Sequence, residues 1–249
     1  MASKYPAVSV CMATCNGSKY IPEQLGSIVP QLLEQDELIV SDDSSNDGTL
    51  EIVNRFKFPG LTILPDQKFS NPIFNFENAL RHAKNDVLVL ADQDDVWLPN
   101  KLNLIREKFV ARTGSVFAIV LDGCVTDATG NEVHPSLFRR MGSGPGILKN
   151  IYDNTFLGCC MAFSRPTLEI ALPFPSRIPM HDMWIGLVAS AFGAVEFVPI
   201  STIRYRKHGQ SLTDFRRDFR PITQIKRRIL LSTYLANRVW ERRRSAREG

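Results

Sequence analysis

The sequence of 249 residues is poor in cysteine, in long apolar runs and in charge of one sign. Its five cysteines are odd in number and form no CxxC pair. This usage excludes a disulfide scaffold and is typical of a reduced, cytosolic protein. Cys159 and Cys160 are adjacent, and we interpret them as buried thiols rather than as metal ligands.

No stretch looks able to cross a membrane. The uncharged run Met183–Val195 falls well short of the about 20 residues that a spanning helix needs. The N-terminal sequence MASKYPAVSVCMATCNG reaches polar residues and a glycine too early to hold the apolar core of a signal peptide. We therefore expect a cytoplasmic protein, and peripheral attachment to the inner face of the plasma membrane stays open.

The net charge is only +4, from 30 Lys and Arg against 26 Asp and Glu, and 44% of the residues are hydrophobic. These values describe a globular chain that is long enough to bury a core. The charge is unevenly spread, because residues 1–203 carry −6 and residues 204–249 carry +10. This asymmetry predicts two zones that meet different partners.

Short apolar runs alternate with segments of helical periodicity through the first half of the chain. The predicted strands are Ala7–Met12, Leu38–Ser41, Leu61–Leu64, Val87–Ala91 and Val116–Cys124. The predicted helices are Tyr20–Leu33, Thr49–Phe56, Ile73–Ala83 and Asn100–Ala111. Such alternation predicts an α/β fold with a mostly parallel central sheet flanked by helices.

The alternation is looser after Ser115. Asn131–Asn150 is rich in Gly, Pro and Arg, so we expect a loop or lid there. Thr155–Ser164 is predicted to be a buried strand, a helix begins near His181, and a last, basic helix begins near Ile222.

Two clusters of carboxylates stand where predicted strands end. They are Asp42, Asp43 and Asp47, and Asp92, Asp94 and Asp95. Ligands of an open parallel sheet bind outside the carboxyl ends of its strands, so both clusters should meet the ATCNGS loop in one crevice. Oxygen ligands suit a hard cation such as Mg²⁺ or Mn²⁺. The first cluster is equally typical of a turn followed by a helix cap.

Three motifs, ATCNGSKYIPEQLGSI, SDDSSNDGT and ADQDDVWLPNKL, resemble in their order and spacing the inverting family 2 nucleotide-sugar glycosyltransferases, which have the GT-A fold. The resemblance covers roughly residues 7–210. Together, the QDDVW and YRKHGQS segments are similar to bacterial rhamnosyltransferase-like enzymes of surface polysaccharide synthesis. The resemblance implies a hexosyltransferase that uses Mn²⁺ or Mg²⁺ and a dTDP- or UDP-sugar donor. The sugar could be L-rhamnose and the acceptor a saccharide or lipid-linked saccharide.

The resemblance also implies roles for particular residues. The residues expected to bind the nucleotide sugar are Thr14, Asn16, Asp42, Asp43, Asp92, Gln93 and Arg206. The expected metal ligands are Asp92 and Asp94 of the DxD motif and His208. Asp95 is expected to support the two aspartates. Tyr205 belongs to the same late segment as Arg206 and His208. The sequence departs from the family pattern at Cys15, in place of an aromatic residue, and at Ser44 and Asn46, in place of Gly and Thr.

The same resemblance divides the chain. A GT-A domain is expected over residues 1–220, with a nucleotide-binding half to about residue 115 and an acceptor half over residues 116–220. Residues 221–249 are expected, from their composition, to form a basic helical tail.

Inverting transfer needs a general base for the acceptor hydroxyl and a cation for the leaving diphosphate. We expect Asp182 to be the base, because it stands at a predicted helix start and resembles the acidic residue of the family in that region. The position is also typical of a helix N-cap, which is compatible with that role. His181 is the rival base, since its ordinary pKa of about 6.5 suits proton transfer.

Several alternatives stay open. Trp97 and Trp184 could contact a sugar, but core positions are the more common use of such tryptophans. The basic tail could bind an anionic membrane, pack on the domain or bind nucleic acid, and the last is least favoured. The alternative enzyme is a nucleotidyltransferase acting on sugar phosphates. Such an enzyme is expected to have a glycine-rich phosphate loop after the first strand, and this sequence has only one glycine there. A non-catalytic nucleotide-binding or RNA-binding module conflicts with the acidic crevice, and no nucleic acid partner is expected.

Overall fold

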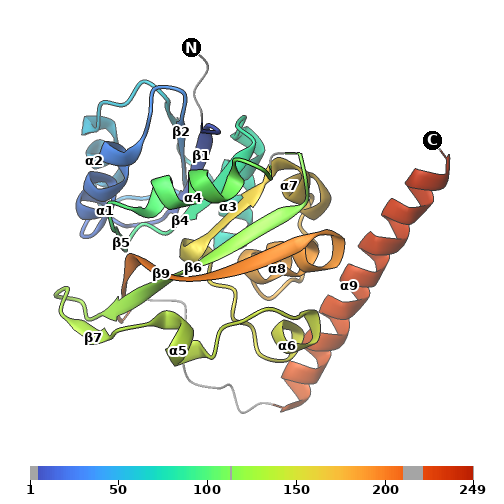
Figure 1. Cartoon of the computed structure of the whole chain (residues 1–249). Coiled ribbons are helices and arrows are strands. Elements are labelled where there is room, and N and C mark those ends of the chain that lie inside the picture. Colours follow the sequence, from blue (N-terminus) through green and yellow to red (C-terminus); the bar gives the residue numbers. More distant parts are fainter. Residues whose placement is uncertain (1–4, 113, 210–220, 249) are drawn as a thin grey trace.

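A computed structural model describes residues 5–112, 114–209 and 221–248, and its centre is a single sheet with helices on both faces (Figure 1). The strand order is β3-β2-β1-β4-β8-β6-β9-β5, and β7 pairs with β6. The strands are β1 Val8–Thr14, β2 Glu37–Asp42, β3 Leu61–Leu64, β4 Val87–Ala91, β5 Val96–Trp97, β6 Phe117–Thr126, β7 Glu132–His134, β8 Met161–Ser164 and β9 Ala194–Arg206. The predicted α/β fold class is confirmed.

The N-terminal half of the sheet is entirely parallel. Strand β1 pairs in parallel with β2 and β4, and β2 pairs in parallel with β3. The strands β1 and β4 consist almost wholly of buried residues, which is typical of parallel strands covered on both faces. In the second half β8 is antiparallel to β4 and β6, whereas β6 and β9 are parallel.

The helices of the first half lie where the periodicity predicts them. They are α1 Ile21–Ile28, α2 Thr49–Arg55, α3 Pro72–His82 and α4 Lys101–Phe109. The first differs from its prediction, because the α-helix stops at Ile28 and a 3₁₀ turn, η1 Val29–Gln31, replaces its last turn. Pro30 lacks the N–H that would continue the helix, which explains the early end.

The segment Asn131–Asn150 is not the single loop that we expected. It holds β7 Glu132–His134, α5 Leu137–Met141 and the start of α6 Ile147–Tyr152. Local caps fix these short elements. The Ser136 hydroxyl accepts a hydrogen bond from Arg139 N at the start of α5, and Gly142 ends that helix in the left-handed region with φ of 63°.

Two further predictions need correction. Only Met161–Ser164 of the predicted strand Thr155–Ser164 is a strand of the sheet, because Gly158–Cys160 forms a 3₁₀ turn, η2. Strand β9 was not predicted at all. Its pairing with β6 shifts register between Val198 and Ser201, so Pro199 lies in a bulge that interrupts the alternation of the sequence.

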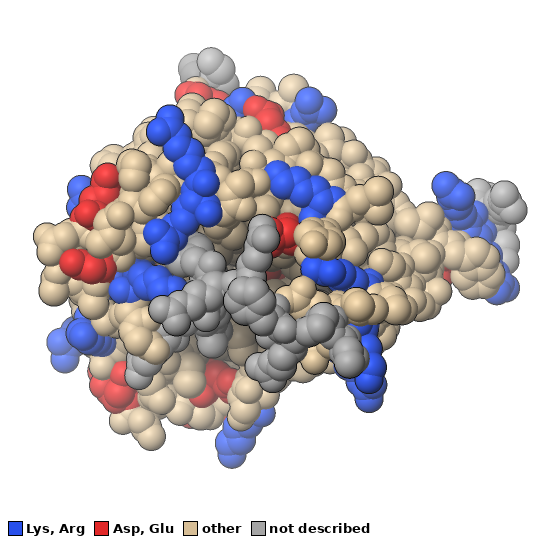
Figure 2. Space-filling model, turned by 90° about the horizontal axis from the view of Figure 1, so that it is seen from below, with Lys and Arg blue, Asp and Glu red and all other residues tan. Residues whose placement is uncertain are grey.

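Three helices follow in the C-terminal half. They are α7 Arg165–Ala171, α8 His181–Phe192 and α9 Pro221–Glu248. Both α8 and α9 begin close to their predicted starts. Helix α9 runs along α6 and α8, and its C-terminal turns extend past the body of the molecule (Figures 1 and 2). None of the helices in the described ranges combines the length and hydropathy of a membrane span.

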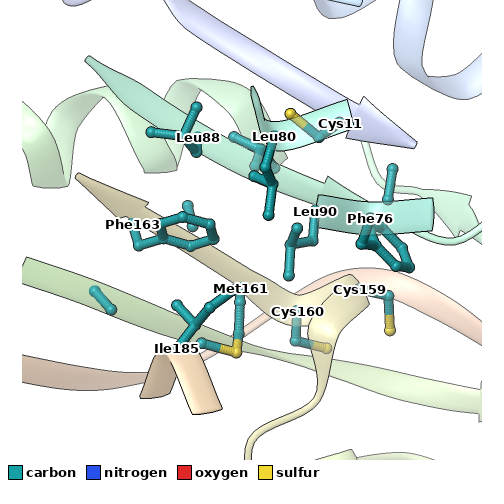
Figure 3. Packing of buried hydrophobic residues seen from close by; sticks show 14 of the residues in the cluster. Cys11, Phe76, Leu80, Leu88, Leu90, Cys159, Cys160, Met161, Phe163 and Ile185 are labelled. Atoms are coloured by element: carbon teal, nitrogen blue, oxygen red, sulfur yellow. The ribbon is translucent and has the colours of Figure 1, made fainter. Parts of the chain in front are cut away.

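Side chains from both halves of the chain form one core. Figure 3 shows Phe76 and Leu80 of α3 close to Leu90 of β4, and Met161 of β8 close to Ile185 of α8. All these residues are buried. The core therefore locks the antiparallel strand β8 beside β4, which brings the segment before β8 to the carboxyl end of β4.

A buried ion pair ties α4 to the start of the sheet. Arg106 of α4 pairs with Asp36, and both side chains are almost completely inaccessible. Asp36 also accepts hydrogen bonds from Val8 N at 2.9 Å and from Leu33 N at 2.7 Å. The carboxylate is thus fully engaged with three segments of the chain.

We expect Arg106→Met to lower the free energy of unfolding by roughly 3–5 kcal/mol, because it leaves the Asp36 charge buried without its partner. Lys108→Met on the same helix is the matched control. Lys108 pairs with Glu196 at 2.5 Å, but both side chains are partly exposed, so the loss should stay below about 1 kcal/mol. Urea denaturation measures both values, and equal losses would contradict the prediction.

Candidate active site

The carboxyl ends of β1, β2 and β4 lie side by side. Thr14 at the end of β1 is level with Asp42 at the end of β2, and Met12 is level with Ala91 at the end of β4. Asp43 N donates a hydrogen bond to Thr14 O at 2.9 Å. The loops that follow these strands therefore meet at one edge of the sheet, as predicted.

Most of the first carboxylate cluster supports the loops themselves. Asp42 is fully buried and accepts hydrogen bonds from the Thr14 hydroxyl at 2.7 Å and from the Ser45 N–H and hydroxyl at 2.8 and 2.6 Å. Asp47 accepts hydrogen bonds from Ser18 N at 3.0 Å and from Thr49 N at 3.1 Å. The turn part of the alternative interpretation thus accounts for Asp42 and Asp47, whereas the N-cap of α2 is Gly48, which has no side chain to cap the helix.

Asp43 and Asn16 lie at the mouth of this region. Asp43 is half-buried, and its Oδ1 accepts a hydrogen bond from Phe69 N at 2.7 Å. Asn16 is exposed with φ of 50°, a left-handed conformation that asparagine tolerates. Its Oδ1 accepts a hydrogen bond from Asn46 N at 3.0 Å, which joins the first loop to the second.

Gln93 links the first loop to the loop after β4. Its Oε1 accepts a hydrogen bond from Cys15 N at 2.9 Å, and its Nε2 donates to Cys15 O at 3.1 Å. Gly17, two residues after Cys15, leaves room for this amide, because a Cβ there would lie 2.3 Å from Gln93 Oε1. The Gln93 amide therefore holds two loops together.

The second carboxylate cluster is concentrated around two aspartates. Oxygens of Asp92 and Asp95 and the Sγ of Cys159 all lie within 4.8 Å of one another. Burial raises the pKa of Asp95 to about 7, and the Asp94 carboxylate adds to this shift. Burial also raises the pKa of Asp92 well above its usual value, with contributions from Asp95, Asp94 and Asp182. Cys159 is buried as expected, yet its sulfur belongs to this cluster.

Asp94 points to a different partner. Its Oδ2 lies 2.7 Å from Nε2 of His208, and both side chains are largely shielded from solvent. The structure thus joins the predicted metal ligands Asp94 and His208 in one pair and places Asp92 with Asp95. In the YRKHGQS segment, Gln210 and Ser211 lie outside the described residues.

Arg206 braces the loop that carries these aspartates. Its backbone N–H donates to Asp95 Oδ1 at 3.0 Å, its Nε donates to Asp94 O at 3.0 Å, and its Nη2 bonds to Glu23. The guanidinium also lies 5.1 Å from the centre of the Tyr20 ring. Arg206 is buried, so these contacts occupy it within the protein.

The first turn of α1 supplies contacts that the sequence did not reveal. Tyr20 stacks on the His208 ring with centroids 4.7 Å apart, Glu23 pairs with Arg206, and Gln24 Nε2 donates to Asp92 O at 2.6 Å. Their spacing of three and four residues places them on one side of a helix. That spacing, directly after the first loop, is the signal that could have identified them.

A buried lysine lies beneath the second cluster. Lys101 Nζ donates to Cys159 O at 2.5 Å and lies 4.1 Å from the centre of the Trp97 ring. Burial lowers its pKa, while Asp95 and Asp92 act in the opposite direction. Lys101 therefore supplies positive charge close to the two carboxylates.

Asp182 lies at the start of α8, beside this cluster. Its Oδ2 accepts a hydrogen bond from Gly158 N at 2.9 Å, and its Oδ1 accepts one from Met183 N at 2.6 Å. Burial raises its pKa to about 6, and the two backbone N–H groups limit the rise. The turn η2 thus connects Asp182, through Gly158, to the second cluster, through Cys159.

His181 has a different environment from that expected of a base. Its ring stacks on Phe76 with centroids 4.1 Å apart, and burial lowers its pKa to about 3. Neither ring nitrogen has a hydrogen-bond partner in the part of the chain that the structure describes. A neutral imidazole of such low basicity is poorly suited to accept a proton.

Both tryptophans that could contact a sugar belong to the core. Trp184 is fully buried and its Nε1 donates to Ala171 O at 2.9 Å, and Trp97 is 2% exposed. The more common interpretation of these residues is therefore confirmed.

The donor set of the second carboxylate cluster fits a divalent metal ion. Asp95 raises the pKa of Asp92, Asp94 raises the pKa of both, and Asp95 Oδ2 is buried with no hydrogen-bond partner among the described residues. Neighbouring carboxylates with a free oxygen favour a hard cation. The Asp94–His208 pair adds an oxygen and a nitrogen ligand nearby.

Carboxylates directly follow the central parallel strand β4, and the fold is that of solved GT-A glycosyltransferases. A family model matches residues 9–169 under the description "Glycosyl transferase family 2". The chain belongs to this family, so the resemblance of its motifs is confirmed.

Several named relatives are similar in sequence. The dTDP-rhamnosyl transferase RfbG of Shigella flexneri is 37% identical over 98 residues, which cover 36% of this chain and 34% of RfbG. The putative teichuronic acid biosynthesis glycosyltransferase TuaG of Bacillus subtilis is 27% identical over 209 residues, which cover 78% of this chain and 77% of TuaG. The matched part of this chain spans between 34% and 65% of the length of RfbG, alr2836 of Nostoc and WfgD of Escherichia coli.

Solved structures share the fold. S. aureus TarS in complex with UDP-GlcNAc has a TM-score of 0.65 at 22% identity and covers 82% of this chain and 60% of its own. The mannosyltransferase PcManGT of Pyrobaculum calidifontis, in complex with GDP-Man and Mn2+, has a TM-score of 0.60 at 20% identity. The match covers 82% of this chain and 57% of PcManGT.

Proposed function

We propose that this chain transfers a sugar from a nucleoside diphosphate donor to a saccharide or lipid-linked saccharide, with inversion at the anomeric carbon, in the synthesis of a bacterial surface polysaccharide. The observation that carries the proposal is the turn η2. It holds Asp182 through Gly158 N and sets Cys159 against Asp92 and Asp95. A candidate base and a candidate cation site thereby share one crevice.

The donor nucleotide belongs, in this proposal, at the edge formed by the first two loops. Asp43 is half-buried and Asn16 is exposed there, so both can reach a ligand. Thr14 and Asp42 bond to each other and position the loop from below. Gln93 and Arg206 hold the loop after β4 in place, which makes them positioning residues.

Mn²⁺ or Mg²⁺ would be held by Asp94 and Asp92, with His208 and Asp95 as neighbours. When bound, it supplies positive charge that stabilises the leaving diphosphate. The residues of the chain prepare this site electrostatically, because the Asp94 carboxylate raises the pKa of both Asp92 and Asp95 and a cation there would relieve this repulsion.

Asp182 accepts the proton of the attacking hydroxyl in this scheme. Two backbone N–H groups fix its carboxylate, and burial raises its pKa to about 6, so it is ionised at neutral pH and still more basic than an exposed aspartate. His181 packs beside it against Phe76 and excludes water from that side.

The finer specificity follows from relatives and is part of the proposal. RfbG is named as a dTDP-rhamnosyl transferase, which favours dTDP-rhamnose as donor. WfgD is named for transfer to a diphosphoundecaprenol-linked sugar, which favours a lipid-linked acceptor. Such an acceptor would place the enzyme in the cytoplasm at the inner face of the plasma membrane.

Thermal unfolding with a panel of donors tests the function. The panel contains dTDP-rhamnose, UDP-glucose, UDP-galactose and GDP-mannose. We expect at least one of these donors, with dTDP-rhamnose favoured, to raise Tm only when Mn²⁺ is present. At about 100 times Kd the rise should be about 5–10 °C for a chain of this size. Mn²⁺ alone and nucleotide alone are the controls. No metal-linked rise with any donor would contradict the proposal.

A further inference from the structure

Helix α9 carries an apolar stripe that faces away from the protein. We name Ile225, Ile229, Ala236 and Trp240 the outer stripe. At 3.6 residues per turn these positions fall within about 60° of one another. Ile225 is 51% exposed, and Ile229 and Trp240 are each 62% exposed. Ile222 falls on the same stripe by its spacing in the sequence, but its side chain lies outside those described.

The opposite side of α9 is the one that packs on the domain. Leu231 and Leu235 are buried there. Arg238 reinforces the contact, because its Nη1 donates to Leu172 O at 2.7 Å and its Nη2 donates to Pro173 O at 3.0 Å. Packing therefore fixes the rotation of the helix and leaves the outer stripe uncovered.

Neighbouring α6 extends the apolar surface. Leu148 and Tyr152, four residues apart, are 83% and 67% exposed. Arg228 of α9 lies 4.2 Å from the centre of the Tyr152 ring and joins the two helices. Among the described residues, five of the nine large hydrophobic side chains that are exposed belong to α6 and α9. The concentration is more than the scattered exposure of a normal surface.

Basic side chains accompany the stripe at both ends. Lys226 and Arg227 are exposed near its start, and Arg243 and Arg244 are exposed near its end. Figure 2 shows that the projecting part of α9 carries Lys and Arg side chains. Glu241, the acidic residue of α9 whose side chain is described, pairs with Arg238 on the packed side. The surface that surrounds the stripe is thus strongly positive.

We propose that the outer stripe of α9 docks on the surface of an anionic lipid bilayer, with the helix lying parallel to the membrane plane. An apolar stripe bordered by Lys and Arg, with tryptophan at its edge, matches the acyl boundary and the anionic headgroups of a bilayer. Pairing with a second copy is disfavoured, because either orientation would bring basic residues of one helix against those of the other.

Vesicle binding by the full chain tests this surface. We expect cosedimentation with vesicles of phosphatidylcholine and phosphatidylglycerol, weaker binding to pure phosphatidylcholine, and release by salt. Trp240 supplies an internal probe, because Trp97 and Trp184 are buried and Trp240 is exposed. Its emission should shift to shorter wavelength on anionic vesicles and become accessible to brominated lipid.

Matched variants distinguish binding through the outer stripe from nonspecific hydrophobic binding. Ile225→Gln with Ile229→Gln should lower the partition coefficient on the order of ten-fold, because two apolar side chains no longer enter the bilayer. Arg243→Gln with Arg244→Gln should lower it by roughly five-fold per charge. Leu33→Gln with Val110→Gln removes two exposed hydrophobic residues elsewhere and should change nothing. Circular dichroism confirms that each variant is folded.

Three results would overturn the proposal. The first is absence of binding to anionic vesicles. The second is equal binding by the wild type and by the Ile225→Gln, Ile229→Gln variant. The third is a Trp240 emission shift that depends on protein concentration without lipid, which would indicate a second copy on the stripe. Failure of sugar transfer leaves all of these measurements unchanged, so the two proposals fail separately.

Discussion

Asp182→Asn should lower the turnover of sugar transfer by roughly 10²–10⁴-fold, the usual contribution of a general base. The amide keeps the shape of the side chain but cannot accept the proton of the acceptor hydroxyl. Binding of the nucleotide donor should persist, because the Asp182 side chain bonds to Gly158 N and Met183 N rather than to the first two loops. Steady-state kinetics and donor titration measure the two effects.

The pH profile of the wild type provides an independent check on Asp182. Burial raises the pKa of Asp182 to about 6, so its carboxylate is unprotonated above pH 6. As the pH falls below 6 the carboxylate becomes protonated, and the enzyme loses activity. We expect kcat/KM to decline below about pH 6 and the decline to be less steep in the residual activity of Asp182→Asn, which retains only the titration of the Asp92 and Asp95 cluster. Near-normal turnover in this variant would remove Asp182 from the role.

Asp94→Asn should abolish the metal-dependent part of donor binding and reduce turnover on the order of 100-fold or more. The substitution removes one negative charge from the loop after β4 and weakens the pair with His208, which lies 2.7 Å away. Metal affinity falls because a neutral amide is a poorer ligand than a carboxylate. Mn²⁺ titration of the donor complex and steady-state kinetics measure the loss.

Asp86→Asn is the matched control for Asp94. Asp86 is exposed and immediately precedes β4, so it lies at the opposite end of the same strand. Its substitution changes the net charge equally but leaves the crevice intact, and kinetics should be unaffected. An Mn²⁺ response preserved in Asp94→Asn would contradict the assignment and favour the cluster of Asp92, Asp95 and Cys159 as the metal site.

The sequence by itself determined the parallel half of the sheet and the place of the crevice. Apolar runs such as Val87–Ala91 are buried on both faces, so their local pattern is sufficient to predict a strand. The carboxylates follow these runs directly, and parallel strands bring their carboxyl ends to one edge. The family motifs lie in the same loops, which is why fold and family could be predicted together.

Local pattern failed where tertiary contacts shape the backbone. Strand β9 contains a bulge at Pro199 that only its pairing with β6 explains. The turn at Gly158–Cys160 interrupts a run that looks like a continuous strand. The exposed stripe of α9 is visible in the sequence, but which face of the helix packs on the domain depends on α6 and α8.

Only the tertiary structure decided how the site residues are grouped. Residues as distant in sequence as Asp94 and His208 form a pair, and Asp92 lies with Asp95 and Cys159. Burial, a property of the whole fold, sets the pKa of Asp182 near 6 and that of His181 near 3, which separates a suitable base from its rival. The sequence specifies which groups are present, and desolvation in the folded chain decides which of them can accept a proton.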